Sequence, residues 1–118
     1  MNEQTSEKGL AGERQALAYL RQHGMRPMCQ RYRCPYGEID LVMLDGECLV
    51  FVEVKLRSRG RKNDGVLAVN FQKQQRLIRA ARCYLGEYPT EMPVRFDIVE
   101  ITGDGVFHLP NAFEGSEW

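Results

Sequence analysis

The sequence is short of the features that would point to a membrane or to export. It contains no apolar run near the ~20 residues that a membrane-spanning helix needs. Its first residues, MNEQTSEKGLAGERQ, are polar and have neither the basic start nor the apolar block of a secretory signal. We therefore expect a soluble, cytoplasmic protein with no membrane partner.

Cysteine is sparse and irregularly spaced. The four cysteines are Cys29, Cys34, Cys48 and Cys83. They include no Cys-x-x-Cys pair and no spacing typical of a zinc site, so we expect reduced thiols and no structural zinc.

The formal net charge of the chain is zero, because sixteen basic residues balance sixteen acidic ones. The distribution along the chain is nevertheless uneven. Nine basic residues and a single acid, Asp64, lie between Lys55 and Arg82, whereas seven acids and only Arg95 lie from Glu87 onward. The total therefore argues against a protein that simply coats nucleic acid, while the basic segment favours local contact with phosphates.

The length allows one hydrophobic core. With 118 residues and 43% apolar content, the chain is too short for two comfortable domains. We expect one domain over residues 1–118.

Hydrophobic periodicity and turn signals predict two helices and five strands. The first helix is expected to begin at a cap formed by Thr5 or Ser6 and to end at Gly24, and the second to run from Asn70 to Tyr88. The strands are expected at 28–33, at two places within 37–56, at 94–101 and at 106–109. The order α-β-β-β-α-β-β predicts an α/β fold, a mixed sheet with flanking helices.

Three charges interrupt the apolar strands of the stretch GEIDLVMLDGECLVFVEVKLRSRGR, namely Asp40, Glu53 and Lys55. An uncompensated buried charge costs several kcal/mol, so their presence calls for a reason. Asp45-Gly46 is a strong turn signal and predicts an antiparallel hairpin. Any loop with an even number of residues brings the two carboxylates within roughly 5–8 Å on one face, and Lys55 shares that face. A loop with an odd number would separate them.

Two neighbouring carboxylates away from water repel each other unless a proton or a cation lies between them. Mg²⁺, or Mn²⁺ in its place, suits such a pair because it binds oxygen ligands and keeps positions for water and phosphate. Glu13 falls between Leu17 and Leu20 on the helical wheel and could add a third carboxylate. Glu38 could be a further ligand or an exposed residue. These residues together suit the metal-dependent hydrolysis of a phosphodiester bond. In that reaction Lys55 would position the attacking water and stabilise the charge that develops on the phosphate.

The basic residues after this hairpin are candidates for nucleic-acid binding. They are Arg57, Arg59, Arg61, Lys62, Lys73 and Arg76. Guanidinium and ammonium groups there would hold a phosphate backbone near the two carboxylates.

Asp40 followed by Glu53-x-Lys55 resembles the signature of the restriction-endonuclease-like nuclease superfamily. Over nearly the whole chain, the sequence also resembles the YraN family of small bacterial proteins. The segments that carry this resemblance are GLAGERQALAYL, GEIDLVMLDGECLVFVEVKLRSR, AVNFQKQQRLIRAARCYL, RFDIVEI and NAF.

The resemblance implies a fold like that of archaeal Holliday-junction resolvases. It matches Glu13 to the acidic residue of the first helix, and Asp40, Glu53 and Lys55 to the metal-binding and catalytic set. Lys73 matches a basic residue of the second helix.

Three functions are compatible with the sequence. The first is a metal-dependent DNA endonuclease acting on branched or damaged DNA, for which a homodimer would suit the cutting of two strands. The second is a nucleic-acid-binding or scaffold protein that keeps the nuclease fold without catalysis. The third is an interaction protein whose acidic C-terminal region pairs with the basic region of another copy.

Overall fold

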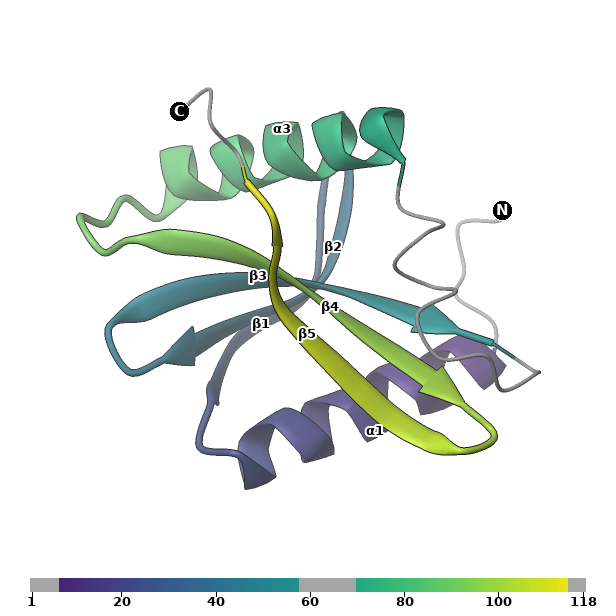
Figure 1. Ribbon diagram of the computed structural model, residues 1–118. Coiled ribbons are helices and arrows are strands. Elements are labelled where there is room, and N and C mark those ends of the chain that lie inside the picture. Colours follow the sequence, from purple (N-terminus) through teal and green to yellow (C-terminus); the bar gives the residue numbers. More distant parts are fainter. Residues whose placement is uncertain (1–6, 58–69, 115–118) are drawn as a thin grey trace.

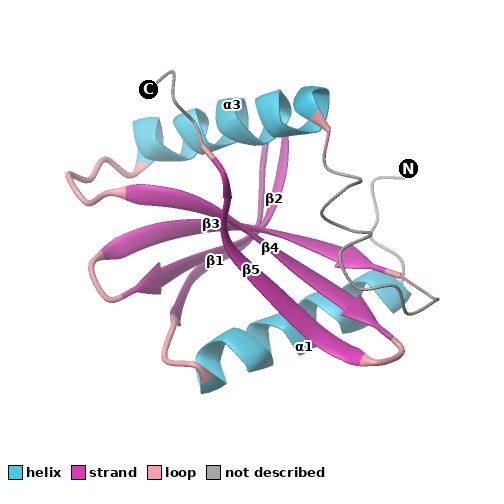
Figure 2. Ribbon diagram, viewed as in Figure 1, coloured by secondary structure: helices cyan, strands magenta, loops and turns pink. Residues whose placement is uncertain are grey.

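The computed structural model describes residues 7–57 and 70–114, which form two helices and five strands. In chain order these are α1 (Glu7–Gln22), β1 (Arg26–Cys34), β2 (Gly37–Asp45), β3 (Cys48–Leu56), α3 (Phe71–Glu87), β4 (Val94–Thr102) and β5 (Gly105–Phe113). The strands form one twisted sheet, with α3 on one face and α1 on the other (Figure 1). Figure 2 shows the two helices as separate layers outside the strands. The predicted α/β fold and element order are confirmed.

The sheet has the strand order β1-β2-β3-β4-β5. β3 and β4 pair in parallel, and all other neighbouring strands are antiparallel. A parallel pair requires a crossover connection, and α3 lies between β3 and β4 in the chain. β3 therefore lies at the centre of a mixed sheet and is buried on both faces, as its continuous apolar sequence predicts.

The ends of α3 agree with the sequence signals. The side chain of Asn70 accepts a hydrogen bond of 2.9 Å from the Lys73 N–H, which makes Asn70 the N-cap, and Tyr88 is the C-cap. The predicted buried face is confirmed for Leu77, Ile78, Ala81 and Tyr84; Ala80 is also buried, whereas Leu85 is half-buried.

α1 and β1 differ slightly from the predicted bounds. The expected cap at Thr5 or Ser6 lies outside the described residues, and α1 ends at Gln22, before Gly24 with its positive φ of 93°. β1 begins at Arg26 and includes Pro27. Pro27 lies on the outermost strand beside a register irregularity, where a missing N–H is tolerated.

Each face of the sheet packs against one helix. The α3 side buries Phe51 and Phe96 together with Leu77, whereas the α1 side buries Val52 together with Leu20. No helix in the described part of the chain is long and apolar enough to cross a membrane.

The side-chain alternation of β2 is broken at Asp40. Ile39 packs in the α3 core, but Leu41, two residues later, packs in the α1 core. On the neighbouring strand β1, Tyr32 pairs with Ile39 and Gln30 pairs with Leu41. The residue between these two partners, Arg31, has a left-handed φ of 56°. Successive odd residues of a regular strand point to the same face, so the two strands change sides together at this position.

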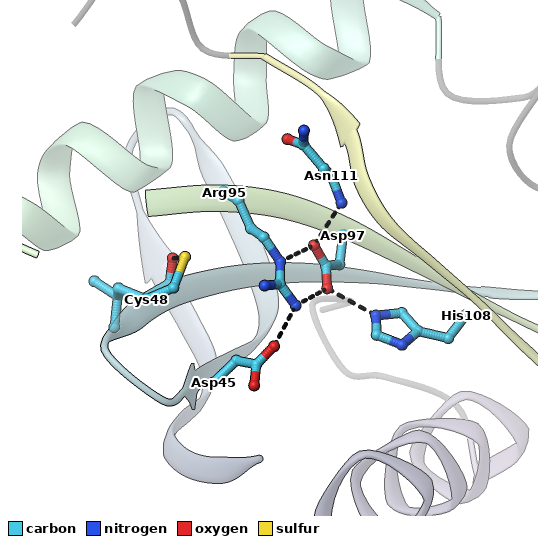
Figure 3. A network of polar contacts seen from close by, with 7 residues as sticks. Asp45, Cys48, Arg95, Asp97, His108 and Asn111 are labelled. Carbon is cyan, nitrogen blue, oxygen red and sulfur yellow. Dashed lines mark hydrogen bonds and ion pairs between the residues drawn. The ribbon is translucent and has the colours of Figure 1, made fainter. Parts of the chain in front are cut away.

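A buried polar cluster surrounds Asp97 on β4 (Figure 3). Its carboxylate is 2.9 Å from Arg95 Nε and 2.7 Å from His108 Nε2, and it accepts a 2.9 Å hydrogen bond from the Asn111 N–H. Arg95 also reaches Asp45 at 2.9 Å. Burial alone would raise the pKa of Asp97, but the bonds from His108 and Arg95 lower it. Asp97 therefore ties β5 and the β2–β3 hairpin to the middle of the sheet.

We expect Asp97→Asn to lower the free energy of unfolding by about 3 kcal/mol at pH 7, because it leaves Arg95 facing a neutral group in a buried network. Asp45→Asn, which removes the exposed partner of the same Arg95, should cost less than about 1 kcal/mol. Urea denaturation measures both.

The pH dependence of this difference has a definite sign. A depressed pKa in the folded state adds stability that is present above the unfolded pKa, about 4, and lost as the pH falls below it. The cost of Asp97→Asn should therefore shrink between pH 5 and pH 2.5. A cost that stays constant or grows over this range would contradict the assigned role of Asp97.

Candidate active site

The β2–β3 hairpin brings the predicted carboxylates together. Asp45 pairs with Cys48, so the two loop residues are Gly46 and Glu47, one position later than the Asp45-Gly46 loop predicted by the turn signal. The loop still has an even number of residues. The last ladder pair toward the open end is Leu41 with Val52. Continued by one residue, this register would set Asp40 against Glu53, and both side chains line the same pocket.

Asp40 and Glu53 line one pocket of about 150 Å³ under the N-terminal half of α3. The other lining residues are Gly37, Glu38, Lys73, Arg76 and Leu77. The start of β2 forms one wall against α3, since a Cβ placed on Gly37 would lie 4.0 Å from Arg76. The structure thus gathers residues from three elements, β2, β3 and α3, around the two acids.

Asp40 is held by the backbone of the neighbouring strand. Its Oδ2 accepts a 2.8 Å hydrogen bond from the Val54 N–H. Burial raises the pKa of Asp40 to about 8, and the nearby charge of Glu53 adds to the effect, against the lowering by the Val54 hydrogen bond. In the absence of a cation, Asp40 therefore carries a proton over much of the neutral pH range.

Glu53 is the most enclosed acid of the pocket, with a side chain only 7% exposed, and it is neutralised by two ammonium groups. Its Oε2 lies 3.1 Å from Lys73 Nζ and 3.4 Å from Lys55 Nζ. Burial lowers the pKa of Lys55, although Glu53 opposes this, and the positive charge of Lys73 lowers it further. Burial would also lower the pKa of Lys73, but the Glu53 carboxylate outweighs it and raises that pKa. The two lysines therefore differ: Lys55 gives up its proton more readily.

Glu13 does not line the pocket, but it reaches Asp40 from α1 on the other side of the sheet. Its side chain is 14% exposed and lies 3.9 Å from Arg31 Nε. Burial raises the pKa of Glu13, the Arg31 charge lowers it, and a side-chain hydrogen bond joins it to Asp40. Arg31 Nε also lies 3.5 Å from Glu38, so Arg31 connects the acid of the helix with the acid at the start of β2.

The predicted nucleic-acid contacts fall into three groups. Lys73 and Arg76 line the pocket. Arg57 is half-buried and donates to the Leu56 carbonyl at 3.1 Å. Arg59, Arg61 and Lys62 lie outside the described residues.

Two charged residues near the pocket escaped the sequence reasoning. Arg31 was hidden in a short strand, where nothing marks a left-handed residue. Glu100 is 1% exposed, and its Cα pairs with that of Lys55 across β3 and β4. The alternation in VRFDIVEI puts Glu100 on the same face as Phe96 and Ile98, a signal that could have identified it.

The donor set fits a hard divalent cation that keeps most of its water. Within residues 7–57 and 70–114, no three carboxylate, imidazole or thiol groups already converge as a complete metal cage. Mg²⁺ is commonly held by one or two carboxylates, with water and substrate phosphate at the other positions. Asp40 and Glu53 match that pattern, and the ammonium of Lys73 already places a positive charge beside Glu53. These residues would hold the metal, with Glu13 supporting Asp40.

Comparison with known proteins now gives the family. The profile of a family described as "Uncharacterised protein family UPF0102" matches residues 12–101. The chain belongs to the UPF0102 family.

Similarity to individual UPF0102 proteins extends over almost the whole chain. The chain is 44% identical to a UPF0102 protein of Janthinobacterium sp. (strain Marseille), over 90% of this chain and 86% of that protein. It is 40% identical to a UPF0102 protein of Legionella pneumophila, over 93% and 97% of the two chains. For a UPF0102 protein of Shewanella amazonensis the identity is 45%, over 89% and 97%. The resemblance to the YraN family seen in the sequence is thereby confirmed.

The raised pKa of Asp40 predicts how stability depends on pH. A carboxyl group whose pKa is higher in the folded than in the unfolded state costs stability as the pH rises from about 4 toward 8. Asp40→Asn keeps an oxygen that can accept from Val54 and removes this cost. We therefore expect the gain in stability of the variant over the parent protein to grow by about 4 kcal/mol between pH 5 and pH 8.5 in metal-free buffer, at about 1.4 kcal/mol per pKa unit.

Urea denaturation across this pH range measures the gain, and Asp45→Asn on the same hairpin controls for the loss of one negative charge. A difference between Asp40→Asn and the parent protein that does not change with pH would show that Asp40 is not buried against Glu53.

Proposed function

We propose that this UPF0102 protein is a metal-dependent endonuclease that hydrolyses phosphodiester bonds in DNA. The observation that carries the proposal is the pocket that Asp40 and Glu53 both line, with Lys55 and Lys73 on the same Glu53 oxygen. Structural ion pairs rarely combine two mutually repelling acids with two ammonium groups in a hollow. Such an arrangement suits a reaction in which negative charge arrives with the substrate and grows in the transition state. The resemblance to restriction-endonuclease-like enzymes supports the same reaction.

Each residue then has a defined task. Asp40 and Glu53 would hold the metal, and Glu13 positions Asp40 through their hydrogen bond. Lys55, whose pKa is lowered, orients the attacking water and exchanges protons with it. Lys73 and Arg76 neutralise the phosphate. A bound Mg²⁺ or Mn²⁺ would supply a water of lowered pKa and Lewis-acid stabilisation of the phosphoryl oxygens. Water attacks phosphorus, one P–O ester bond breaks, and the leaving oxygen takes up a proton.

The setting of this reaction is also part of the proposal. The protein would act in the cytoplasm on DNA, with branched DNA as the preferred substrate by analogy to the resolvase-like fold. A homodimer would allow symmetric cuts in two strands. The basic residues of the chain between Arg57 and Arg76, including those outside the described part, would carry the DNA backbone toward the pocket.

One observation favours the alternative of a non-catalytic nucleic-acid-binding protein. Lys73 and Lys55 already neutralise Glu53, so the pocket is electrostatically satisfied without a metal. In that case DNA binding would be sensitive to salt, would survive Asp40→Asn and Glu53→Gln, and would proceed without cleavage.

Cleavage assays distinguish these functions. Labelled duplex, flap, single-stranded and four-way-junction DNA is incubated with the protein and Mg²⁺ or Mn²⁺. We expect metal-dependent cutting of at least one substrate and a loss of at least about 100-fold with Lys55→Ala, since one positioned proton-transfer group contributes about 10²–10⁴-fold.

Arg79→Gln, at an exposed position of α3 away from the pocket, is the matched control and should cut at nearly the parent rate. If no substrate is cut with either metal, the proposed endonuclease function is refuted. It is also refuted if Lys55→Ala cuts DNA at the parent rate.

A further inference from the structure

The side chain of Lys73 occupies the part of the pocket that a cation bound to Glu53 would need. Lys73 lines the pocket together with Asp40 and Glu53, and its Nζ is 3.1 Å from Glu53 Oε2. A metal ion at this oxygen would be a third cation beside the ammonium groups of Lys55 and Lys73, and it would have to share the oxygen with both or replace one of them. Like charges this close repel strongly, so replacement is the favourable outcome.

The two lysines on Glu53 differ in their freedom to leave. Lys55 stands two residues from Glu53 on the same central strand, is 19% exposed and does not line the pocket. Lys73 reaches Glu53 from α3, and its side chain is 35% exposed. A long side chain anchored on a neighbouring helix and open to solvent can swing away by rotation about its own bonds, whereas Lys55 is confined by the strand.

We propose that Lys73 is a built-in counter-cation that a divalent metal must displace from Glu53, and that the displaced ammonium is then available to a substrate phosphate. This rests on the proposed function and names a regulation of the same site. Lys73 would act as a positioning residue: it keeps Glu53 neutralised in the free protein and opposes metal binding until DNA is present.

Linkage makes the consequence measurable. The metal alone must break the Lys73–Glu53 ion pair, whereas metal and phosphate together offer the ammonium a new partner. Metal and DNA should therefore strengthen each other's binding, and by reciprocity the factor is the same in either direction. Removing the Lys73 charge should tighten metal binding in the absence of DNA and weaken this coupling.

The test measures binding of Mn²⁺ by electron paramagnetic resonance, with the full-length protein and without turnover. Lys73→Gln should bind Mn²⁺ about tenfold more tightly than the parent protein in the absence of DNA, within the usual range of coupling between two ligands. A duplex with hydrolysis-resistant phosphorothioate linkages should tighten Mn²⁺ binding to the parent protein by a similar factor, and to Lys73→Gln by much less.

Arg76→Gln is the matched control. It removes the same charge from the same helix and the same pocket, and among the described ion pairs none joins Arg76 to Glu53. It should change Mn²⁺ affinity by less than about threefold, the part due to general electrostatics. Thermal unfolding of both variants verifies that the pocket is still formed.

The outcomes separate this inference from the proposed function. In one outcome, the parent protein binds Mn²⁺, Asp40→Asn abolishes this binding, and Lys73→Gln leaves the Mn²⁺ affinity unchanged or lowers it. This result overturns the counter-cation role of Lys73 and leaves the proposed endonuclease function intact. Equal tightening by Lys73→Gln and Arg76→Gln overturns it as well. No Mn²⁺ binding by any form of the protein, with or without DNA, overturns both.

Discussion

The enclosure of Glu53 between two ammonium groups is the interaction on which the rest of the site depends. A carboxylate that is 7% exposed on a central strand would be costly without partners, and Lys55 and Lys73 provide them at 3.4 and 3.1 Å. One partner belongs to the same strand and the other to α3, so the two ammonium groups reach Glu53 from different elements. Asp40 has no such cationic partner among the described ion pairs, and burial together with the nearby charge of Glu53 raises its pKa to about 8.

The two buried polar clusters of the sheet solve the same problem in different ways. Asp97 has its lone pairs occupied by Arg95, His108 and the Asn111 N–H, and its pKa is lowered. Asp40 accepts one backbone hydrogen bond, shares another with Glu13 and has no basic partner among the described ion pairs, and its pKa is raised by burial and by the nearby charge of Glu53. Full satisfaction is what a structural carboxylate needs, and partial satisfaction is what a site for an incoming cation needs. The contrast between the clusters therefore favours the pocket of Asp40 over the Asp97 cluster as the candidate functional site.

Much of this could be predicted from the sequence because the relevant signals are local. Periodicity gave the face of α3, and an even hairpin loop was sufficient to bring Asp40 and Glu53 together, even though the turn lies one residue later than expected. Arg31 and the Asp97 cluster were missed because each depends on contacts between distant segments. No local sequence pattern predicts that His108 on β5 contacts Asp97 on β4, because this contact depends on the register irregularity between the two strands.

The change of side in β2 has a consequence for how the protein assembles. Ile39 fills one core and Leu41 the other, so a slip of one residue in the hairpin would move the side chains of β2 to the opposite layer and disturb the packing of both cores. Misaligned pairing therefore costs packing on both faces of the sheet. The alignment that satisfies the two layers is the same one that brings the two acids together, so the chain cannot complete its interior without also completing its pocket.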